Sequence, residues 1–215
     1  MTPRIIQSSL ALLMVAAAPL SAAAEQMTFR LLGNYSRVTF KSDAPLETIV
    51  GTTAGPGITA TLSGDPAKPR EATGTVKVDL TTVKSGVERR DADMLGKNYW
   101  DTANEANRYA LFELRSVEIA GPLQPGVEMP AKLKGILTVK QKPVEITADA
   151  RITYVALMPD QVEQQKRFGF TSDNIRLKAT FGTTFTNHGM QVPQLLMFKL
   201  SSDIQLEADL TFVRQ

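Results

Sequence analysis

Strict alternation of apolar and polar residues runs through much of this 215-residue chain and constrains its fold more than any other feature. Between Val144 and Tyr154 every even position is apolar and every odd position is polar or charged. A period of two is typical of a β-strand that buries one face and exposes the other. The same pattern recurs in further segments, at 75–80, 132–140, 175–185 and 196–212, and in shorter runs around 29–31, 38–40, 49 and 58–62.

These segments, about eight to ten in number and separated by turn residues, predict an all-β protein. The spacing that would join parallel strands through helices is missing from the sequence. A closed barrel is favoured over a sandwich because the alternating runs near the C-terminus are long, and tilted barrel strands need length. We therefore expect an extended, antiparallel, eight-stranded barrel with a short helical insertion.

The first 24 residues have the composition of a signal peptide. Arg4 supplies a positive charge, and the apolar stretch from Leu10 to Leu20 is too short to span a bilayer as an uncleaved anchor. Small residues from Ser21 to Ala24 are suited to cleavage. We expect residues 1–24 to be removed near Ala24, and residues 25–215 to form one periplasmic or secreted β-barrel domain.

Composition argues against several functional classes. The 24 Lys and Arg residues nearly balance the 22 Asp and Glu residues and are scattered along the chain, which disfavours nucleic acid as a partner. Cysteine is absent, and the single histidine, His188, lies in an Asn-His-Gly turn where we expect it to be solvent-exposed. We therefore predict no catalytic residue, no metal site and no cofactor. A hydrolase or isomerase acting on a substrate inside the barrel is the less favoured alternative.

A short helical insertion is predicted after the alternating run at 75–80. Ser85 and Glu88 have the spacing of a capping box, so a helix is expected to start at Ser85 and to stop near Gly96. Thr102 and Glu105 have the same spacing and predict a second short helix. Further along, the polar segment 158–167 is the third place where a helix could form between strands.

The first predicted helix carries an Arg-Asp pair on its apolar face. Val87, Met94 and Leu95 share that face with Arg90 and Asp91 at helical spacing. Buried charges need partners, because an unpaired buried ion is costly. Two interpretations stay open at this point: the pair contacts a ligand head group, or it is a clasp that ties the helix to the barrel.

The order of these elements resembles that of the YceI-like family of exported, lipocalin-like proteins. The resemblance rests on the following residues: Lys84-Ser85-Gly86, Arg90-Asp91, Leu95, Trp100-Asp101, Phe112 to Ser116, the hairpin Leu133 to Pro143 and the strand Ile175 to Gly182. It covers roughly Phe29 to Phe212. One departure is Tyr35 before Ser36, where the family often has a histidine in its first strand.

The resemblance implies a barrel whose lumen binds an amphiphilic isoprenoid or quinone-like lipid, without a bound cofactor. The expected contacts of the lipid tail are Phe40, Met94, Leu95, Trp100, Phe112, Ala150, Phe181 and Phe198, with Arg90 and Asp91 at the head group. Small residues on the predicted inner faces could leave room for the tail or could serve tight packing: Gly135, Ala148, Ala150, Ala179, Ser202 and Ala208.

Partners beyond the lipid are less constrained. A transient contact with a membrane is expected of a lipid carrier, and we expect the protein to be a monomer or a homodimer. Phe168 and Phe170 could form a lid, a membrane-docking edge or simply part of the core. The alternative function is a filled barrel that acts as a stress-response or protein-interaction module without a lipid.

Overall fold

The computed structural model describes residues 26–195 and 198–215 of the chain. The predicted signal peptide therefore lies outside the described residues. The strands are β1 (Met27–Leu31), β2 (Arg37–Ala44), β3 (Glu47–Ala54), β4 (Ile58–Gly64), β5 (Thr73–Asp79), β6 (Tyr109–Ile119), β7 (Glu128–Val139), β8 (Lys142–Ala156), β9 (Asp173–Thr184), β10 (Gln194–Leu195), β11 (Phe198–Lys199) and β12 (Asp203–Arg214). The α-helices are α1 (Glu88–Met94) and α2 (Pro159–Gln165). Short 3-10 turns connect them: η1 (Gly33–Tyr35), η2 (Gly55–Gly57), η3 (Pro69–Glu71), η4 (Leu80–Thr82), η5 (Glu105–Asn107), η6 (Lys166–Phe168) and η7 (Thr186–His188).

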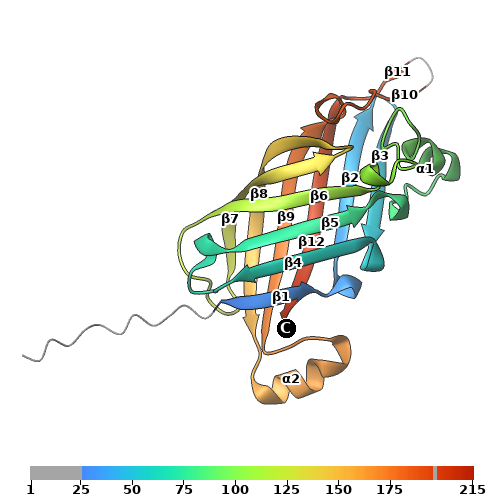
Figure 1. Ribbon diagram of the computed structural model, residues 1–215. Helices are drawn as coiled ribbons and strands as arrows, with labels where there is room; N and C mark the ends of the chain where they lie inside the picture. The colour runs from blue at the N-terminus through green and yellow to red at the C-terminus, as the bar shows by residue number, and fades with distance from the viewer. Residues whose placement is uncertain (1–25, 196–197) are drawn as a thin grey trace, which may run out of the picture.

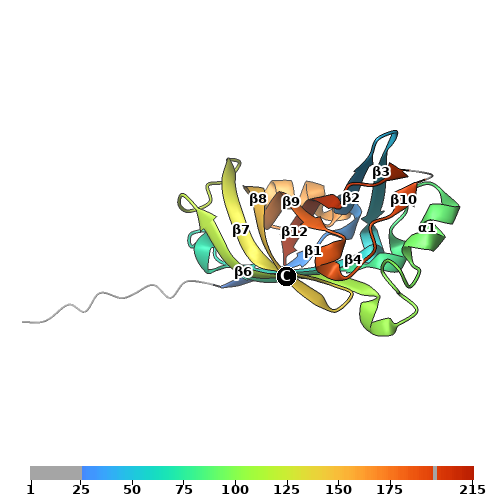
Figure 2. The same cartoon turned by 90° about the horizontal axis from the view of Figure 1, so that it is seen from above.

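Eight antiparallel strands close into a barrel in the order β1-β4-β5-β6-β7-β8-β9-β12, and β12 pairs back with β1 (Figure 1). β12 is shared between two neighbours. Phe212–Arg214 pairs with β1, whereas Gln205–Asp209 pairs with β2, which forms a hairpin with β3. The hairpin thus extends the wall at one end of the barrel. Seen from above, α1 lies beside β3 and β10 (Figure 2). The predicted eight-stranded barrel with a helical insertion is confirmed.

Alternation in the sequence becomes alternation between the two faces of the barrel wall. In β8, Ile146, Ala148 and Ala150 are buried, whereas the residues between them are exposed. The register places Ala150 between Ala131 of β7 and Ala179 of β9. Each inward residue therefore meets inward residues of the adjacent strands, which is what closes a core inside a barrel.

The long alternating run at 196–212 is not one strand, so that prediction is wrong for its first half. β12 begins only at Asp203, just after Ser202. The chain upstream leaves the barrel wall because its backbone is bonded elsewhere: the amide of Leu200 donates to the carbonyl of Pro193, and the amide of Ser201 donates to that of Asp43. Alternation alone cannot tell a continuous strand from two strands separated by a bend.

The first predicted capping box is also wrong. α1 begins at Glu88 with Val87 as its N-cap, three residues after the predicted start at Ser85. The hydroxyl and the backbone amide of Ser85 both donate to Oδ1 of Asp91, each at 2.7 Å. Ser85 therefore ties the approach to the helix onto a residue inside the helix. The predicted stop near Gly96 is confirmed, since α1 ends at Met94.

The second predicted helix is a single 3-10 turn, η5, and its cap is a different residue. Asn104 caps the turn by accepting a hydrogen bond from the amide of Ala106 at 3.1 Å. Thr102, the predicted cap, instead donates to the carbonyl of Leu95 at 3.3 Å. The polar segment 158–167 does form a helix, α2.

Two buried clusters divide the interior, and they define the two ends used below. The packed end comprises Phe29, Ile58, Ala60, Val117, Ile119, Leu123, Ala131, Leu133, Ala148, Ala150, Ile152, Ile175, Ala179, Leu210 and Phe212. The hollow end comprises Leu80, Leu137, Val139, Ile146, Phe185, Met190 and Ile204, with half-buried residues around them. In Figure 1, α2 lies beyond the packed end, and β10 and β11 lie at the hollow end.

Candidate functional site

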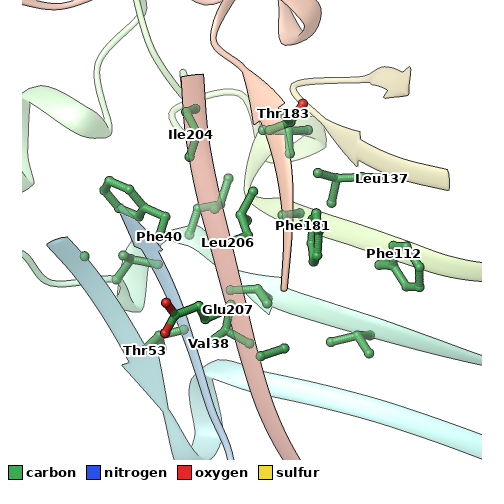
Figure 3. A pocket seen from close by; sticks show the side chains of 18 of the residues that line it. Val38, Phe40, Thr53, Phe112, Leu137, Phe181, Thr183, Ile204, Leu206 and Glu207 are labelled. Atoms are coloured by element: carbon green, nitrogen blue, oxygen red, sulfur yellow. The ribbon is translucent and has the colours of Figure 1, made fainter. Parts of the chain in front are cut away.

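A cavity of about 610 Å³ occupies the hollow end and reaches toward the packed end. Its wall is formed by the inward residues of the strands, as the close view shows (Figure 3). Those labelled there include Val38, Phe40, Phe112, Leu137, Phe181, Ile204 and Leu206. A volume of this size is typical of pockets for small organic ligands. The apolar lining suits a hydrocarbon tail.

Two aromatic rings lie against the wall over glycines of neighbouring strands, and this keeps the lumen open. A Cβ atom on Gly51 would lie 2.1 Å from Cε1 of Phe40. A Cβ atom on Gly135 would lie 2.5 Å from Cζ of Phe112. A side chain at Gly51 or Gly135 would collide with the neighbouring ring, so only glycine allows Phe40 and Phe112 to occupy these positions. Phe40 also meets Trp100 edge to face, with ring centroids 6.0 Å apart.

The cavity reaches solvent beside α1. Val87, Arg89 and Asp93 line it and are solvent-exposed, whereas most of the lining strand residues are not. Arg90 also lines the cavity, and its guanidinium is held by Oε1 of Glu47 on β3 at 2.6 Å. A rim of mixed charge with an apolar residue, Val87, thus borders the opening.

The structure brings together six of the ten predicted ligand-binding residues. Those that line the cavity are Phe40, Arg90, Met94, Trp100, Phe112 and Phe181. Asp91 and Leu95 belong to the same segment but do not line it. Ala150 lies in the buried cluster of the packed end, and the side chain of Phe198 lies outside the described part of the chain. For these four residues, contact with a ligand stays a prediction.

Asp91 serves as a clasp in this structure. Its carboxylate accepts both hydrogen bonds from Ser85, and these bonds lower the pKa of Asp91 below its usual value. Arg90 differs, because it is paired with Glu47 and also borders the cavity. The adjacent Arg89 was missed by the sequence analysis. It is exposed at the opening and makes no ion pair or side-chain hydrogen bond with the described residues.

His188 is buried, with 1% of its surface exposed, which contradicts the expectation of a solvated turn. Its Nδ1 lies 3.2 Å from the carbonyl oxygen of Lys142, and its Nε2 lies 2.9 Å from Oγ1 of Thr183. Burial lowers the pKa of His188, so the ring is neutral at neutral pH. Since a carbonyl can only accept, Nδ1 carries the hydrogen and Thr183 donates to Nε2. The turn folds over the barrel end, and this long-range packing has no local sequence signal.

Phe168 and Phe170 do not form a lid over the cavity. They follow α2 beyond the packed end, and neither lines the cavity. The ring of Phe170 packs against Tyr35, with centroids 5.1 Å apart, whereas Phe168 is 41% exposed beneath the guanidinium of Arg167. A membrane-docking role for Phe168 stays a prediction.

Metal ligands do not cluster in the described part of the chain: no group of three His, Cys, Asp or Glu side chains is placed to hold an ion there. Within residues 26–195 and 198–215, no helix is long and apolar enough to cross a bilayer.

Residues 29–212 match the family model described as the YceI-like domain. The chain belongs to the YceI-like domain family. The predicted resemblance is thereby confirmed over nearly the whole described barrel. No functionally curated protein matches this YceI-like chain in sequence.

Solved structures of other YceI-like and related proteins share the fold. A polyisoprenoid binding domain from Saccharophagus degradans, implicated in plant cell wall breakdown, is 12% identical with a TM-score of 0.63, over 88% of this chain and 99% of that one. Burkholderia cenocepacia BcnA is 16% identical with a TM-score of 0.61, over 82% and 95% of the two chains. The Campylobacter jejuni YCEI protein is 17% identical with a TM-score of 0.56, over 74% and 81%. At these identities the likeness shows the fold alone.

Proposed function

We propose that this protein binds an amphiphilic isoprenoid or quinone-like lipid in its cavity and carries it through the periplasm after export. The observation that supports this most is the apolar cavity of about 610 Å³ inside a closed barrel. Burying a lipid tail there would gain roughly 25 cal/mol for each Å² of apolar surface removed from water. The protein acts as a binding protein and not as an enzyme, as a monomer or a homodimer.

The half-burial of large inward side chains supports the same proposal. Phe112, Phe181 and Leu206 point inward yet are only partly covered by other residues of the chain. Side chains in a filled core lose nearly all of their exposure, as Phe29 does at the packed end. A bound tail would cover the remaining surface. The polyisoprenoid named for the Saccharophagus degradans domain has a chemistry that fits such a lining.

Trp100 offers a direct test of binding, because it is the single tryptophan of the chain and lines the cavity. We expect farnesol added to lipid-free protein to change the intensity and wavelength of Trp100 fluorescence in a saturable manner. If neither farnesol, farnesyl diphosphate nor a ubiquinone analogue changed the Trp100 fluorescence in a saturable manner, the proposed function would be contradicted.

A cavity-filling variant controls for binding elsewhere. Ala110 lines the cavity, so Ala110→Leu adds volume inside the lumen and should weaken lipid binding at least tenfold. Ala156→Leu adds the same volume on the exposed end of β8 and should bind as the wild type does. Equal binding by both variants would place the lipid outside the cavity.

A further inference from the structure

The hydroxyl of Ser42 is a buried polar group that has no hydrogen-bond partner among the described residues. Ser42 lines the cavity, and only 2% of its surface is exposed. Among the described residues, its Oγ is the one buried side-chain polar atom without a hydrogen-bond partner. Buried hydroxyls are nearly always bonded, because an unpaired one loses its bonds to water and gains none in return. Ser42 can therefore be satisfied by a polar group that enters the cavity, either a water molecule or a polar atom of a ligand.

The other buried polar groups in the cavity wall are already satisfied. The hydroxyl of Thr183 is engaged with Nε2 of His188 at 2.9 Å, and the hydroxyl of Thr53 with that of Thr82 at 2.7 Å. Neither group requires a ligand. This contrast singles out Ser42 as the position where a polar atom of a bound molecule would fit.

The neighbours of Ser42 on β2 and β3 place no charge beside its hydroxyl; the charged residues of the cavity lining, Arg89, Arg90, Asp93 and Glu207, lie on α1 and β12. Along β2, the residues on either side of it point outward: Lys41 is paired with Glu207 at 2.5 Å, and Asp43 accepts from Thr48 at 2.8 Å. The next inward residue is Phe40, and the cross-strand partner of Ser42 on β3 is Ile49. A phosphate or carboxylate placed here would be stripped of water without a counter-charge, which is strongly unfavourable. A neutral oxygen would lose far less.

We propose that Ser42 binds the polar head of the lipid by donating its hydroxyl hydrogen to a neutral oxygen, either an alcohol or a carbonyl. This inference rests on the proposed lipid-binding function and sharpens it. The preferred ligand is then a neutral isoprenoid alcohol or quinone-like molecule. Neither a bare hydrocarbon nor a diphosphate held by Arg89 at the opening satisfies Ser42.

Three ligands with the same tail separate these possibilities: farnesol, the hydrocarbon farnesene and farnesyl diphosphate. Their affinities for the complete barrel protein can be compared through the fluorescence of Trp100. We expect the wild type to prefer farnesol to both others. Ser42→Ala should weaken farnesol binding about 3- to 10-fold, the usual range for one lost hydrogen bond, and leave farnesene binding unchanged.

Thr53→Val is the matched control, because it removes a cavity-lining hydroxyl that is already bonded to Thr82. It should keep the preference for farnesol over farnesene. An unchanged preference in Ser42→Ala, or a wild-type preference for farnesyl diphosphate, would overturn the assignment of Ser42 while leaving lipid binding intact. Failure of all three ligands to bind the wild type would instead contradict the proposed function itself.

Discussion

The packed end and the hollow end of the barrel are continuous along several of the same strands, yet one is filled with side chains and the other encloses a cavity. At the packed end, large residues such as Phe29 and Phe212 share a cluster with alanines, among them Ala148 and Ala150. Large and small side chains interdigitate there and fill most of the space, although Ala148, Ala179 and Phe212 also border the inner end of the cavity. At the hollow end the aromatic rings lie against the wall over glycines.

This difference shows which small residues make a lumen. An alanine can belong to either end: Ala150 lies in the buried cluster of the packed end, whereas Ala110 lines the cavity. Glycines beside an aromatic ring let that ring lie flat, as Phe40 does over Gly51 and Phe112 over Gly135, and the space in the centre remains. Small residues on an inward face are therefore compatible with either outcome, and the residue beside each one decides between them.

The largest expected effect comes from truncating an aromatic side chain at each end. Phe29→Ala removes a fully buried ring and should lower the free energy of unfolding by about 3–5 kcal/mol. Phe112→Ala should cost less than half of that, because one face of this ring already borders the cavity. Urea denaturation of lipid-free protein measures both values. Equal losses would contradict the division into packed and hollow ends.

Adding volume at the two ends should have a smaller, opposite pattern. Ala150→Leu overfills the packed end and should lower the free energy of unfolding by about 1–3 kcal/mol. Ala110→Leu places its added carbons in the cavity and should change that free energy by less than about 1 kcal/mol. Thermal or urea unfolding of the two variants compares them. A stable Ala150→Leu protein would show that the packed end has room to spare.

Two buried serines sharpen the comparison further. Ser36 donates to the carbonyl of Leu32 and accepts from the amide of Thr211, both at 3.0 Å, so Ser36→Ala should destabilise by about 1–3 kcal/mol. Ser42 has no such bonds, and Ser42→Ala should leave lipid-free protein equally stable or more stable by up to about 1 kcal/mol. A marked loss of stability in Ser42→Ala would mean that its hydroxyl is bonded within the folded chain.

The smallest effect concerns pH and His188. The unfolded chain binds a proton near the ordinary histidine pKa of 6.5, whereas burial lowers the pKa of His188 in the folded protein. The contribution of His188 is therefore constant above about pH 6.5. Stability falls as pH drops from there toward the folded-state pKa, by at most about 1.4 kcal/mol per pH unit.

The control for that pH dependence is His188→Gln, which does not titrate. The difference in unfolding free energy between wild type and His188→Gln should be flat above about pH 6.5 and shrink below it. A difference that stayed constant down to pH 5 would contradict the buried, neutral state of the ring.

Much of the fold could be predicted from the sequence because alternation fixes which residues point inward. The inward positions of β8, from Ile146 to Ile152, are all buried as expected. The failures lie where tertiary contacts override local pattern. Ser85 bonds to Asp91 in place of capping the helix, and the run at 196–212 is interrupted because Ser201 bonds to Asp43.

The candidate site was predictable in part for the same reason. Phe40, Phe112 and Phe181 were identified because alternation places them inward, and they line the cavity. Ala150 was chosen for its small size, but cavity and core cannot be distinguished without knowing its neighbours. Ser42 follows Phe40 at the spacing of two, so its inward direction was readable from the sequence; the absence of a bonding partner was not.

The most direct test of the account is native mass spectrometry of the protein purified gently from the cells that produce it, with solvent extraction and identification of any bound lipid. The account predicts one lipid per barrel, an isoprenoid with a neutral alcohol or carbonyl head group. It also predicts that Ala110→Leu, purified in the same way, loses that lipid while Ala156→Leu keeps it. An empty wild-type barrel that also fails to take up isoprenoid lipids in vitro would contradict the central claim.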